Sequence, residues 1–234
     1  MIDLHMHTIY SDGNNTILDM KNEAIKRNLS CIAITDHYST SWKSGIINTL
    51  NVNNIPNYIT EIKRIRRNSS IKILIGIEID TDSYFEDIKR INFENFDIVL
   101  LEYIKDLKIL KNYINYFKNK TGIFDNNQHI LALAHSNIHV NISKKEFKDD
   151  FISIMSEYGI FFELNSRYLE YFISYPEYIR ELVSNDINFT IGSDAHSVRR
   201  VGDVNKIYQF LEKLNGKNCL EKIHNFISNF KIIK

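Results

Sequence analysis

Seven short apolar runs alternate with amphipathic stretches along almost the whole chain, and this alternation limits the fold more than any other feature. The runs are rich in Ile, Val, Leu and Phe, as expected of buried β-strands. Strands that are each followed by a helix favour one parallel sheet with right-handed crossovers. The expected strands cover residues 2–6, 30–35, 71–79, 96–103, 129–136, 159–166 and 187–196.

The stretches between these runs have the features of helices. Thr16 is a suitable N-cap for a helix that continues to about Asn28, and Pro176 stands in the first turn of another. Apolar residues at 58, 59, 62 and 65 form a stripe with a basic outer face. The expected helices cover residues 16–28, 57–67, 84–91, 105–120, 143–158, 176–186, 204–214 and 219–229.

The chain carries no sign of a division into domains. Its 234 residues contain only two prolines and no linker, low-complexity segment or charge block. A chain of this length can form one or two domains, and it can bury a substantial core without disulfides. We therefore expect an α/β fold with a single domain that spans residues 1–234.

The charge and cysteine content exclude several classes of protein. Lys and Arg balance Asp and Glu at 29 each, so no general attraction to nucleic acid or an anionic membrane is implied. No apolar run approaches the roughly 20 residues that cross a bilayer, and the first residues do not resemble a signal peptide. Cys31 and Cys219 lie far apart, which excludes a disulfide framework and fits a reducing compartment. The expected location is the cytoplasm.

Polar residues mark the point where six of the seven expected strands end. His, Asp, Glu or Asn occurs at each of these exits, in the segments HMHT, TDH, GIEID, AHS, ELNS and GSDAH. The carboxyl ends of parallel strands share one face of an α/β fold, where active sites are built. We therefore expect one site there. Its metal-binding candidates are His5, His7, His37, Glu78, His135, Asp194 and His196.

The residue types and their spacing favour metal binding. His5 and His7 are two apart on an extended segment, so both imidazoles face the same side. Asp194 and His196 repeat this spacing. The carboxylate of Glu78 has two oxygens and could bridge two ions. Imidazole and carboxylate ligands together suit zinc, manganese or iron better than magnesium or calcium.

The remaining three histidines are interpreted differently. His129 enters its strand at the opposite end, and His224 lies on a helix near the end of the sequence, so both are expected to be structural. His139 follows His135 by four residues, in an expected loop. Its membership of the site is left open.

The polar segments also occur in the order of a known family. HMHTIYSDG, ITDH, GIEID, AHS and GSDAH resemble the motifs of the PHP (polymerase and histidinol phosphatase) family. The resemblance extends from His5 to Gly202, and five motifs in register are highly specific. It implies a distorted (β/α)7 TIM-like barrel with a trinuclear metal site.

The resemblance also implies which residues bind each ion. Asp36 would orient a ligand or pass a proton, or it could simply cap a turn. Two or three divalent ions (Zn, Mn or Fe) are expected per chain. The first would be held by His5, His7, Glu78 and Asp194, the second by Glu78 and His135, and the third by Asp12, His37 and His196.

One position departs from the family pattern. Many members have a further histidine near the end of the fourth strand, but this chain reads FDIVLLEYIKD there. Glu102 is the nearest candidate for its place. It could be a replacement ligand or an ordinary polar residue at a strand end, so occupancy of the second metal position is left open.

The expected reaction is hydrolysis of a small phosphomonoester, resembling histidinol phosphate or a nucleotide. Clustered divalent ions activate a water as hydroxide near neutral pH and neutralise charge on the phosphate oxygens. Asp36, Glu78 and His196 are the candidates for catalytic roles. The resemblance implies the same phosphoesterase activity.

A phosphorylated substrate also needs cationic and polar contacts. Arg167 follows ELNS, and Arg199 and Arg200 follow GSDAH, so all three are expected near the metal-bearing rim. An arginine fork matches a phosphate group in a bidentate manner. Arg167 is favoured because it comes soonest after its strand, and Asn165 could hydrogen-bond the substrate or finish the strand.

Two alternative functions remain open. The first is a phosphodiesterase or nuclease, because related domains resemble proofreading units of DNA polymerases. Residues 63–67 (KRIRR) are the only compact basic patch, and we interpret them as solvated surface, so a nucleic-acid partner is not expected. The second is a non-catalytic metal-binding scaffold. The connection 37–57, with Trp42, could form a lid, a substrate wall or a mobile loop.

Overall fold

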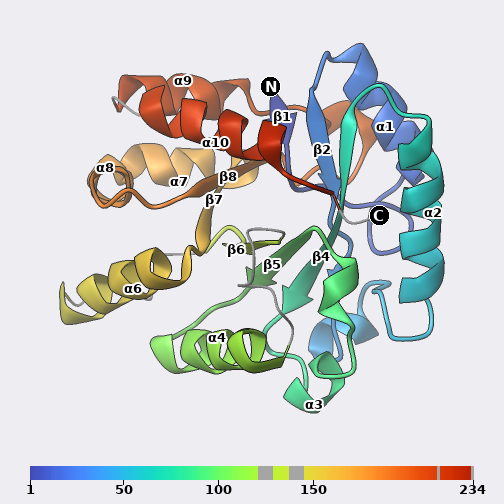
Figure 1. Ribbon diagram of the computed structural model, residues 1–234, viewed down its shortest axis with the longest axis horizontal. Coiled ribbons are helices and arrows are strands. Elements are labelled where there is room, and N and C mark those ends of the chain that lie inside the picture. The colour runs from blue at the N-terminus through green and yellow to red at the C-terminus, as the bar shows by residue number, and fades with distance from the viewer. Residues whose placement is uncertain (121–128, 137–144, 215–216, 233–234) are drawn as a thin grey trace.

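The computed structural model describes residues 1–120, 129–136, 145–214 and 217–232. These residues form an α/β barrel whose strands lie at the centre and whose helices lie around the outside (Figure 1). The strand order is β1-β2-β4-β5-β6-β7-β8, and every pair is parallel. The strands are β1 (Ile2–Asp3), β2 (Cys31–Ile34), β3 (His37–Tyr38), β4 (Lys72–Asp80), β5 (Ile98–Glu102), β6 (Ile130–Leu133), β7 (Phe161–Asn165) and β8 (Phe189–Gly192).

The short strand β3 explains why eight strands make a seven-membered barrel. β3 follows β2 after two residues and, like β2, pairs in parallel with β4. It therefore continues the position of β2 around the sheet. The (β/α)7 barrel expected from the sequence is confirmed, with strand positions that agree with the seven apolar runs.

The first and last strands nearly close the barrel. The amide of Leu4 donates to the carbonyl of Ile191 at 2.8 Å, and Met6 forms an isolated parallel bridge with Ala195. Further along, the amide of Asp194 donates to the carbonyl of His5 at 2.9 Å. Closure thus brings the first and last polar motifs side by side, although they are almost 190 residues apart in the sequence.

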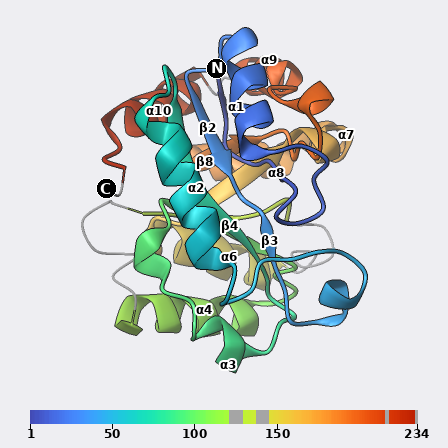
Figure 2. The same cartoon turned by 90° about the vertical axis from the view of Figure 1, so that its right-hand side faces the viewer.

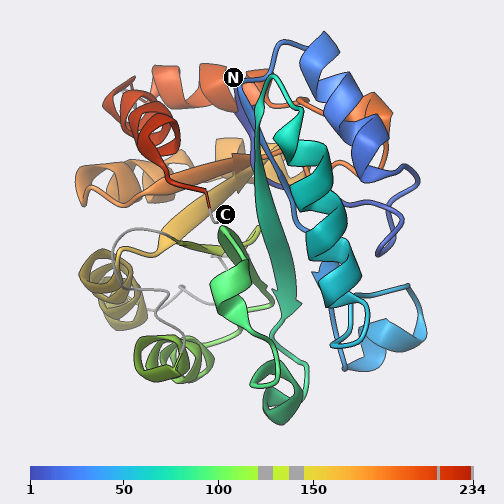
Figure 3. The same ribbon diagram turned by 45° about the vertical axis from the view of Figure 1, so that its right-hand side comes forward.

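The helices cover the outer face of the barrel. Helix α2 (Ile55–Arg67) lies in front of β2 and β4 in Figure 2 and beside the long strand β4 in Figure 3. Helix α1 begins where the sequence predicts, because Thr16 and Asp19 form a capping box. The helices are α1 (Ile17–Lys26), α2 (Ile55–Arg67), α3 (Phe85–Ile88), α4 (Leu107–Lys120), α6 (Lys145–Tyr158), α7 (Leu169–Ser174), α8 (Pro176–Ser184), α9 (Asn205–Lys213) and α10 (Lys217–Asn229), with 3-10 turns η1 (Trp42–Gly45), η2 (Phe93–Asn95), η3 (Ser166–Tyr168) and η4 (Val198–Arg200).

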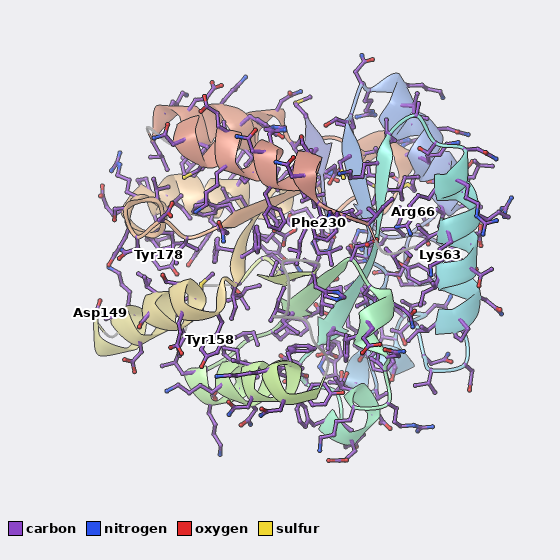
Figure 4. All side chains as sticks on the ribbon, in the orientation of Figure 1. Lys63, Arg66, Asp149, Tyr158, Tyr178 and Phe230 are labelled. Carbon is purple, nitrogen blue, oxygen red and sulfur yellow. The ribbon has the colours of Figure 1, made fainter. Side chains whose placement is uncertain are left out.

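Helix α2 shows both where the stripe pattern succeeds and where it fails. Its apolar stripe is buried, and the Tyr58 hydroxyl lies 2.8 Å from the carbonyl oxygen of Ile34. The basic residues Lys63 and Arg66 lie on the same helix (Figure 4). Arg66 is not solvated surface, because its guanidinium donates to the buried carboxylate of Asp97 at 2.9 Å. The interpretation of residues 63–67 as a uniformly solvated patch is therefore wrong at this position.

Most of the strands are shorter than the apolar runs predict, although β4 has the expected length. The expected first strand reaches Met6, but the β1 ladder ends at Asp3, and Met6 forms only an isolated bridge with Ala195. Helix α7 and the 3-10 turns were not expected. In the part of the chain that the structure describes, no helix has the length and apolar character that crossing a membrane requires.

Candidate metal centre

The side chains expected at the strand ends converge at the carboxyl end of the barrel. Five of the seven are buried, His135 and His196 are partly buried, and they come from segments throughout the sequence. Among the described residues, four groups have ligand atoms that lie within 4.8 Å of one another. The groups are His7, Asp12, His37 and His196; His5, Glu78 and His135; His5, His7 and Asp194; and His37, Glu78 and Glu102.

The two histidines of the first motif face the same cavity, as the strand alternation predicts. The Nε2 atoms of His5 and His7 are 2.9 Å apart, and His7 Nε2 is 3.2 Å from Asp194 Oδ1. Burial lowers the pKa of His7 to about 3, and the neighbouring charge of His37 acts in the same direction. A neutral imidazole is the form that binds a metal ion.

Glu78 lies at the centre of the cluster, on β4. Its Oε1 is 3.0 Å from His135 Nε2, while its Oε2 is 2.8 Å from His37 Nδ1 and 3.4 Å from His5 Nε2. Burial alone would raise its pKa, but the histidines around it outweigh burial and hold the pKa well below its usual range. The two oxygens therefore face different sides of the cluster, as a bridging carboxylate would.

A third set of ligand atoms lies beside the loop that follows β1. His196 Nε2 is 3.1 Å from Asp12 Oδ2, and His37 Nε2 is 3.8 Å from Asp12 Oδ1. The other ring nitrogen of His196 lies 3.0 Å from the carbonyl of Asp194, which orients the ring. Burial acts to raise the pKa of Asp12, but the hydrogen bond to His196 and the charges of the nearby histidines lower it.

Glu163 contacts two of the expected ligands, although the sequence motifs did not single it out. Its Oε1 lies 2.6 Å from His5 Nδ1, and its Oε2 accepts from the backbone amide of His135 at 2.7 Å. Gly192 leaves room for this contact, since a Cβ there would lie 2.5 Å from Glu163 Oε1 and 2.4 Å from His5 Cβ. The available signal was its place in the ELNS segment, two residues before Asn165 on the same side of β7.

Glu102 points into the cluster and meets a lysine that the sequence did not single out. Glu102 is 1% exposed, and its Oε1 accepts from Lys43 Nζ at 2.5 Å. Lys43 lies on η1, and its ammonium is also 3.1 Å from His37 Nδ1. No sequence motif marks Lys43, because the folding of its loop against the barrel decides where it lies.

The donor atoms fit divalent ions. His7 Nδ1 and Glu78 Oε2 are buried without a hydrogen-bond partner of acceptable geometry among the described residues. Such buried polar atoms are costly unless something satisfies them. The set combines imidazole nitrogens with carboxylate oxygens, which suits zinc, manganese or iron.

The backbone is strained at three exits from the barrel strands. Tyr103, His135 and Asp194 have φ angles of 59°, 28° and 53°, in the left-handed region that non-glycine residues rarely adopt. Residues held this way cost on the order of 1 kcal/mol or more and cluster at functional sites. The strain falls on two of the expected ligands and on the residue that follows Glu102.

The expected substrate contacts differ in how close they come to the cluster. Arg167 Nη1 donates to Asp194 Oδ2 at 3.1 Å, so this guanidinium reaches the centre while part of it stays exposed. Arg200 instead pairs with Asp203 at 3.3 Å, and Arg199 is exposed. Asn165 is buried, and its amide group donates to Glu163 Oε1 at 3.2 Å.

The remaining expected residues lie as follows. Asp36 is buried, and its carboxylate accepts from the Thr8 amide at 2.7 Å and the Ser11 hydroxyl at 2.6 Å, which holds the loop after β1. His129 Nδ1 lies 2.8 Å from the Phe96 carbonyl, away from the cluster. The remaining two histidines are His224, which contacts the Tyr208 hydroxyl, and His139, which lies outside the described residues.

Comparison with known proteins identifies the family. The model of a family described as the PHP domain matches residues 3–230. A DNA polymerase/3'-5' exonuclease PolX of Bacillus subtilis (strain 168) is 24% identical over 211 residues, which is 86% of this chain and 35% of that protein. The chain therefore spans about a third of the length of this curated relative.

Solved structures share the fold at low sequence identity. A histidinol phosphate phosphatase from Lactococcus lactis subsp. lactis Il1403, complexed with Zn, L-histidinol and phosphate, is 19% identical with a TM-score of 0.65, over 91% of this chain and 93% of that one. A putative histidinol phosphatase from Listeria monocytogenes is 15% identical with a TM-score of 0.63, over 89% and 100%. A chain from an archaeal ribonuclease P complex with mature tRNA is 14% identical with a TM-score of 0.62, over 96% and 88%.

Proposed function

The chain belongs to the PHP domain family, and on that basis we propose that it is a metal-dependent phosphoesterase that hydrolyses a small phosphomonoester. The observation that carries the proposal is the convergence of His5, His7, Glu78 and Asp194 on one buried point. Ordinary protein cores do not bury several histidines and acids together without partners for all their atoms.

We assign the ions to the residue groups that the geometry supports. His5, His7 and Asp194 would hold one ion with Glu78, while Asp12, His37 and His196 would hold another. His135, which forms a group with His5 and Glu78, would contribute its Nε2 to the first of these ions. Divalent ions bound there supply an activated water and neutralise the charge that develops on the phosphoryl oxygens.

The protein's own groups position these ligands and the substrate. Glu163 contacts the Nδ1 atom of His5. The Nε2 atom of His5 is therefore free to bind an ion. Arg167 would bind a substrate phosphate oxygen, because its guanidinium is half-exposed and already directed at the centre by Asp194. Glu78 and His196 act as ligands in this proposal, and Asp36 acts by holding the loop that carries Asp12.

A small phosphomonoester is favoured over other esters by the neighbouring structures. The Lactococcus lactis protein with this fold is complexed with zinc, L-histidinol and phosphate. The likeness is in the fold, so histidinol phosphate itself is one candidate substrate among small monoesters, and zinc is one candidate ion among zinc, manganese and iron.

The experiment is hydrolysis of an aryl phosphate by the protein after chelation and reconstitution with zinc or manganese. We expect turnover that depends on the added ion and is lost in His7→Ala and in Asp194→Ala. Turnover by the wild-type protein no faster than by these two variants would contradict the proposal.

A phosphodiesterase is the second candidate, favoured by the similarity to a DNA polymerase/3'-5' exonuclease. The same site could bind a diester, so the two candidates differ in substrate and not in ligands. Activity on a single-stranded oligonucleotide, without activity on small monoesters, would favour the diesterase. If the protein purified without chelator retains less than one ion per chain, the third alternative, a non-catalytic scaffold, would be favoured instead.

A further inference from the structure

A lysine ammonium lies inside the cluster of metal-binding groups. Lys43 is only 8% exposed, although the loop that carries it lies on the outside of the barrel. Its Nζ is 2.5 Å from Glu102 Oε1 and 3.1 Å from His37 Nδ1. A buried lysine needs a partner of opposite charge, and Glu102 is that partner.

The loop that carries Lys43 is anchored at several points. Ser39 donates to the buried carboxylate of Asp80 at 2.7 Å, and Ser41 donates to the same oxygen. Ser41 also caps η1 by accepting from the amide of Lys43. Beyond η1, the amide of Leu50 donates to the carbonyl of His37 at 2.6 Å. The position of Lys43 therefore follows from backbone and side-chain contacts on both sides of it.

Two neighbouring strands carry the two acids that fix the position of Lys43. Asp80 on β4 is directly opposite Glu102 on β5 in the parallel register. Asp80 holds the loop through its two serine contacts, while Glu102 accepts from the Lys43 ammonium. The Lys43 ammonium also lies 5.3 Å from the centre of the Tyr103 ring, a further contact suited to a cation.

The protonation of His37 Nδ1 decides whether this atom can bind an ion next to Lys43. His37, Glu78 and Glu102 form one of the four groups with ligand atoms within 4.8 Å, and Nδ1 is the ring atom that faces Glu78 and Glu102. If Nδ1 has its lone pair, Lys43 donates to it, because an ammonium can only donate. If Nδ1 carries the proton, it has no lone pair. In neither tautomer can Nδ1 bind an ion while Lys43 stays in place.

The second tautomer keeps His37 available on its other side. With the proton on Nδ1, the ring presents Nε2 to Asp12, 3.8 Å away, and to the group that includes His196. His37 can thus take part in one ion site and exclude a second one. The ammonium supplies the positive charge that Glu102 requires in place of an ion.

We propose that the Lys43 ammonium takes the place of the metal ion that Glu102 would otherwise bind, so that the chain holds two divalent ions and one fixed cation. The inference rests on the proposed function, because it assumes that the rest of the cluster binds metal. It assigns a role to the position where the sequence departs from the family pattern.

The test is the number of ions bound per chain, measured by inductively coupled plasma mass spectrometry after reconstitution with zinc. We expect two ions in the wild-type protein and three in Lys43→Met/Glu102→His, which removes the ammonium and supplies an imidazole. Lys89→Met is a matched control, because Lys89 is 2.5 Å from Glu86 in an ion pair far more exposed than that of Lys43. This control should keep two ions.

The outcomes separate the inference from the proposed function. Three ions in the wild-type protein would overturn the inference and leave the metal site intact. Fewer than two would contradict the metal site and the inference together. An unchanged count of two in the double variant would also overturn the inference, provided that its circular dichroism spectrum is that of the wild-type protein.

A second readout does not depend on an added ligand at position 102. Lys43→Met alone leaves the buried Glu102 without its lysine. We expect the chelated variant to melt at a lower temperature than the chelated wild-type protein. Added zinc should then raise the melting temperature of the variant by more than it raises that of the wild-type protein. Equal shifts in the two proteins would argue that Lys43 does not substitute for an ion.

Discussion

The two ends of the barrel bury the same kinds of residue but satisfy them differently. At the amino end, Asp97 accepts from Arg66 at 2.9 Å and from the amide of Ile75 at 2.8 Å. At the carboxyl end, Glu78 is equally buried, but its close neighbours are histidine rings. One acid has a protein cation and a backbone donor, whereas the other lies among groups that are themselves metal ligands.

The two histidines that flank β6 show the same contrast. His129 stands just before the strand, and its Nδ1 lies 2.8 Å from the Phe96 carbonyl, which is a sufficient partner. His135 stands just after it, with φ at 28° and Nε2 directed at Glu78. The end of a parallel strand at which a histidine lies therefore separates a structural histidine from a candidate ligand more clearly than residue type does.

Burial alone therefore does not identify a functional site. Buried charges at the amino end are paired within the protein and should stabilise the fold. Those at the carboxyl end are incompletely paired and strained, a state that a protein keeps when a ligand satisfies the groups. Substitutions at the two ends of the barrel should therefore have different effects.

The largest effect is expected for Glu78→Gln. The amide keeps the size of the side chain but loses the negative charge that faces four histidines. We expect aryl phosphate hydrolysis to fall about 100- to 1,000-fold, because the ions that stabilise the transition state are lost or weakly held. Steady-state kinetics and metal content measure it. Activity and metal content near those of the wild-type protein would remove Glu78 from the centre.

The opposite pattern is expected for Asp97→Ala at the amino end. The substitution removes the partner of Arg66, and breaking a buried ion pair costs about 3–5 kcal/mol in the free energy of unfolding. Urea denaturation measures the loss. Metal content should stay at the wild-type value, and a variant that loses metal while keeping its stability would show that the two ends do not divide these roles.

A smaller effect on activity is expected for Glu163→Gln. Glu163 orients His5 and accepts from the His135 amide but is not one of the proposed ligands. Loss of such a partner typically reduces metal affinity or activity about 10- to 100-fold. Isothermal titration with zinc and kinetics at saturating zinc would show whether the loss is in affinity. A variant indistinguishable from the wild-type protein would make Glu163 a residue of the fold alone.

The smallest expected effect is a pH dependence of stability in metal-free protein. Burial by itself lowers the pKa of His37, but Glu78 and Glu102 outweigh it and raise the pKa to about 10. A raised histidine pKa stabilises the fold below the unfolded value of about 6.5, and this stability is lost as the pH rises toward 10. Chelated protein should therefore melt at a lower temperature at pH 9 than at pH 6.5.

Zinc should remove this dependence, because bound histidines are neutral and the ion supplies the positive charge. Differential scanning calorimetry of chelated and zinc-loaded protein at both pH values compares them directly. A chelated protein that is more stable at pH 9 than at pH 6.5 would contradict the charge distribution described for the cluster.

Much of this arrangement could be predicted from the sequence. The parallel α/β arrangement was predicted from the apolar runs, and the seven-stranded barrel and the PHP domain family were predicted from the resemblance of five motifs. Both predictions are confirmed. The polar exits also located the groups that converge, since parallel strands bring their carboxyl ends together. The roles of the individual ligands stay predictions.

The remainder depends on tertiary contacts that leave little trace in the sequence. Glu163 belongs to the polar ELNS segment, but its contact with His5 depends on the absence of a side chain at Gly192. Lys43 lies in a loop without a motif, and its position depends on Asp80, some 37 residues later. Arg66 was taken for surface because helical periodicity cannot show that Asp97 lies beneath it.

The most direct test of the metal centre is anomalous scattering from crystals of the protein grown with zinc. Data collected on both sides of the zinc absorption edge should show peaks enclosed by His5, His7, Glu78 and Asp194 and by Asp12, His37 and His196. No peak is expected among His37, Glu78 and Glu102. Crystals whose anomalous peaks all lie away from the carboxyl end of the barrel would contradict the account.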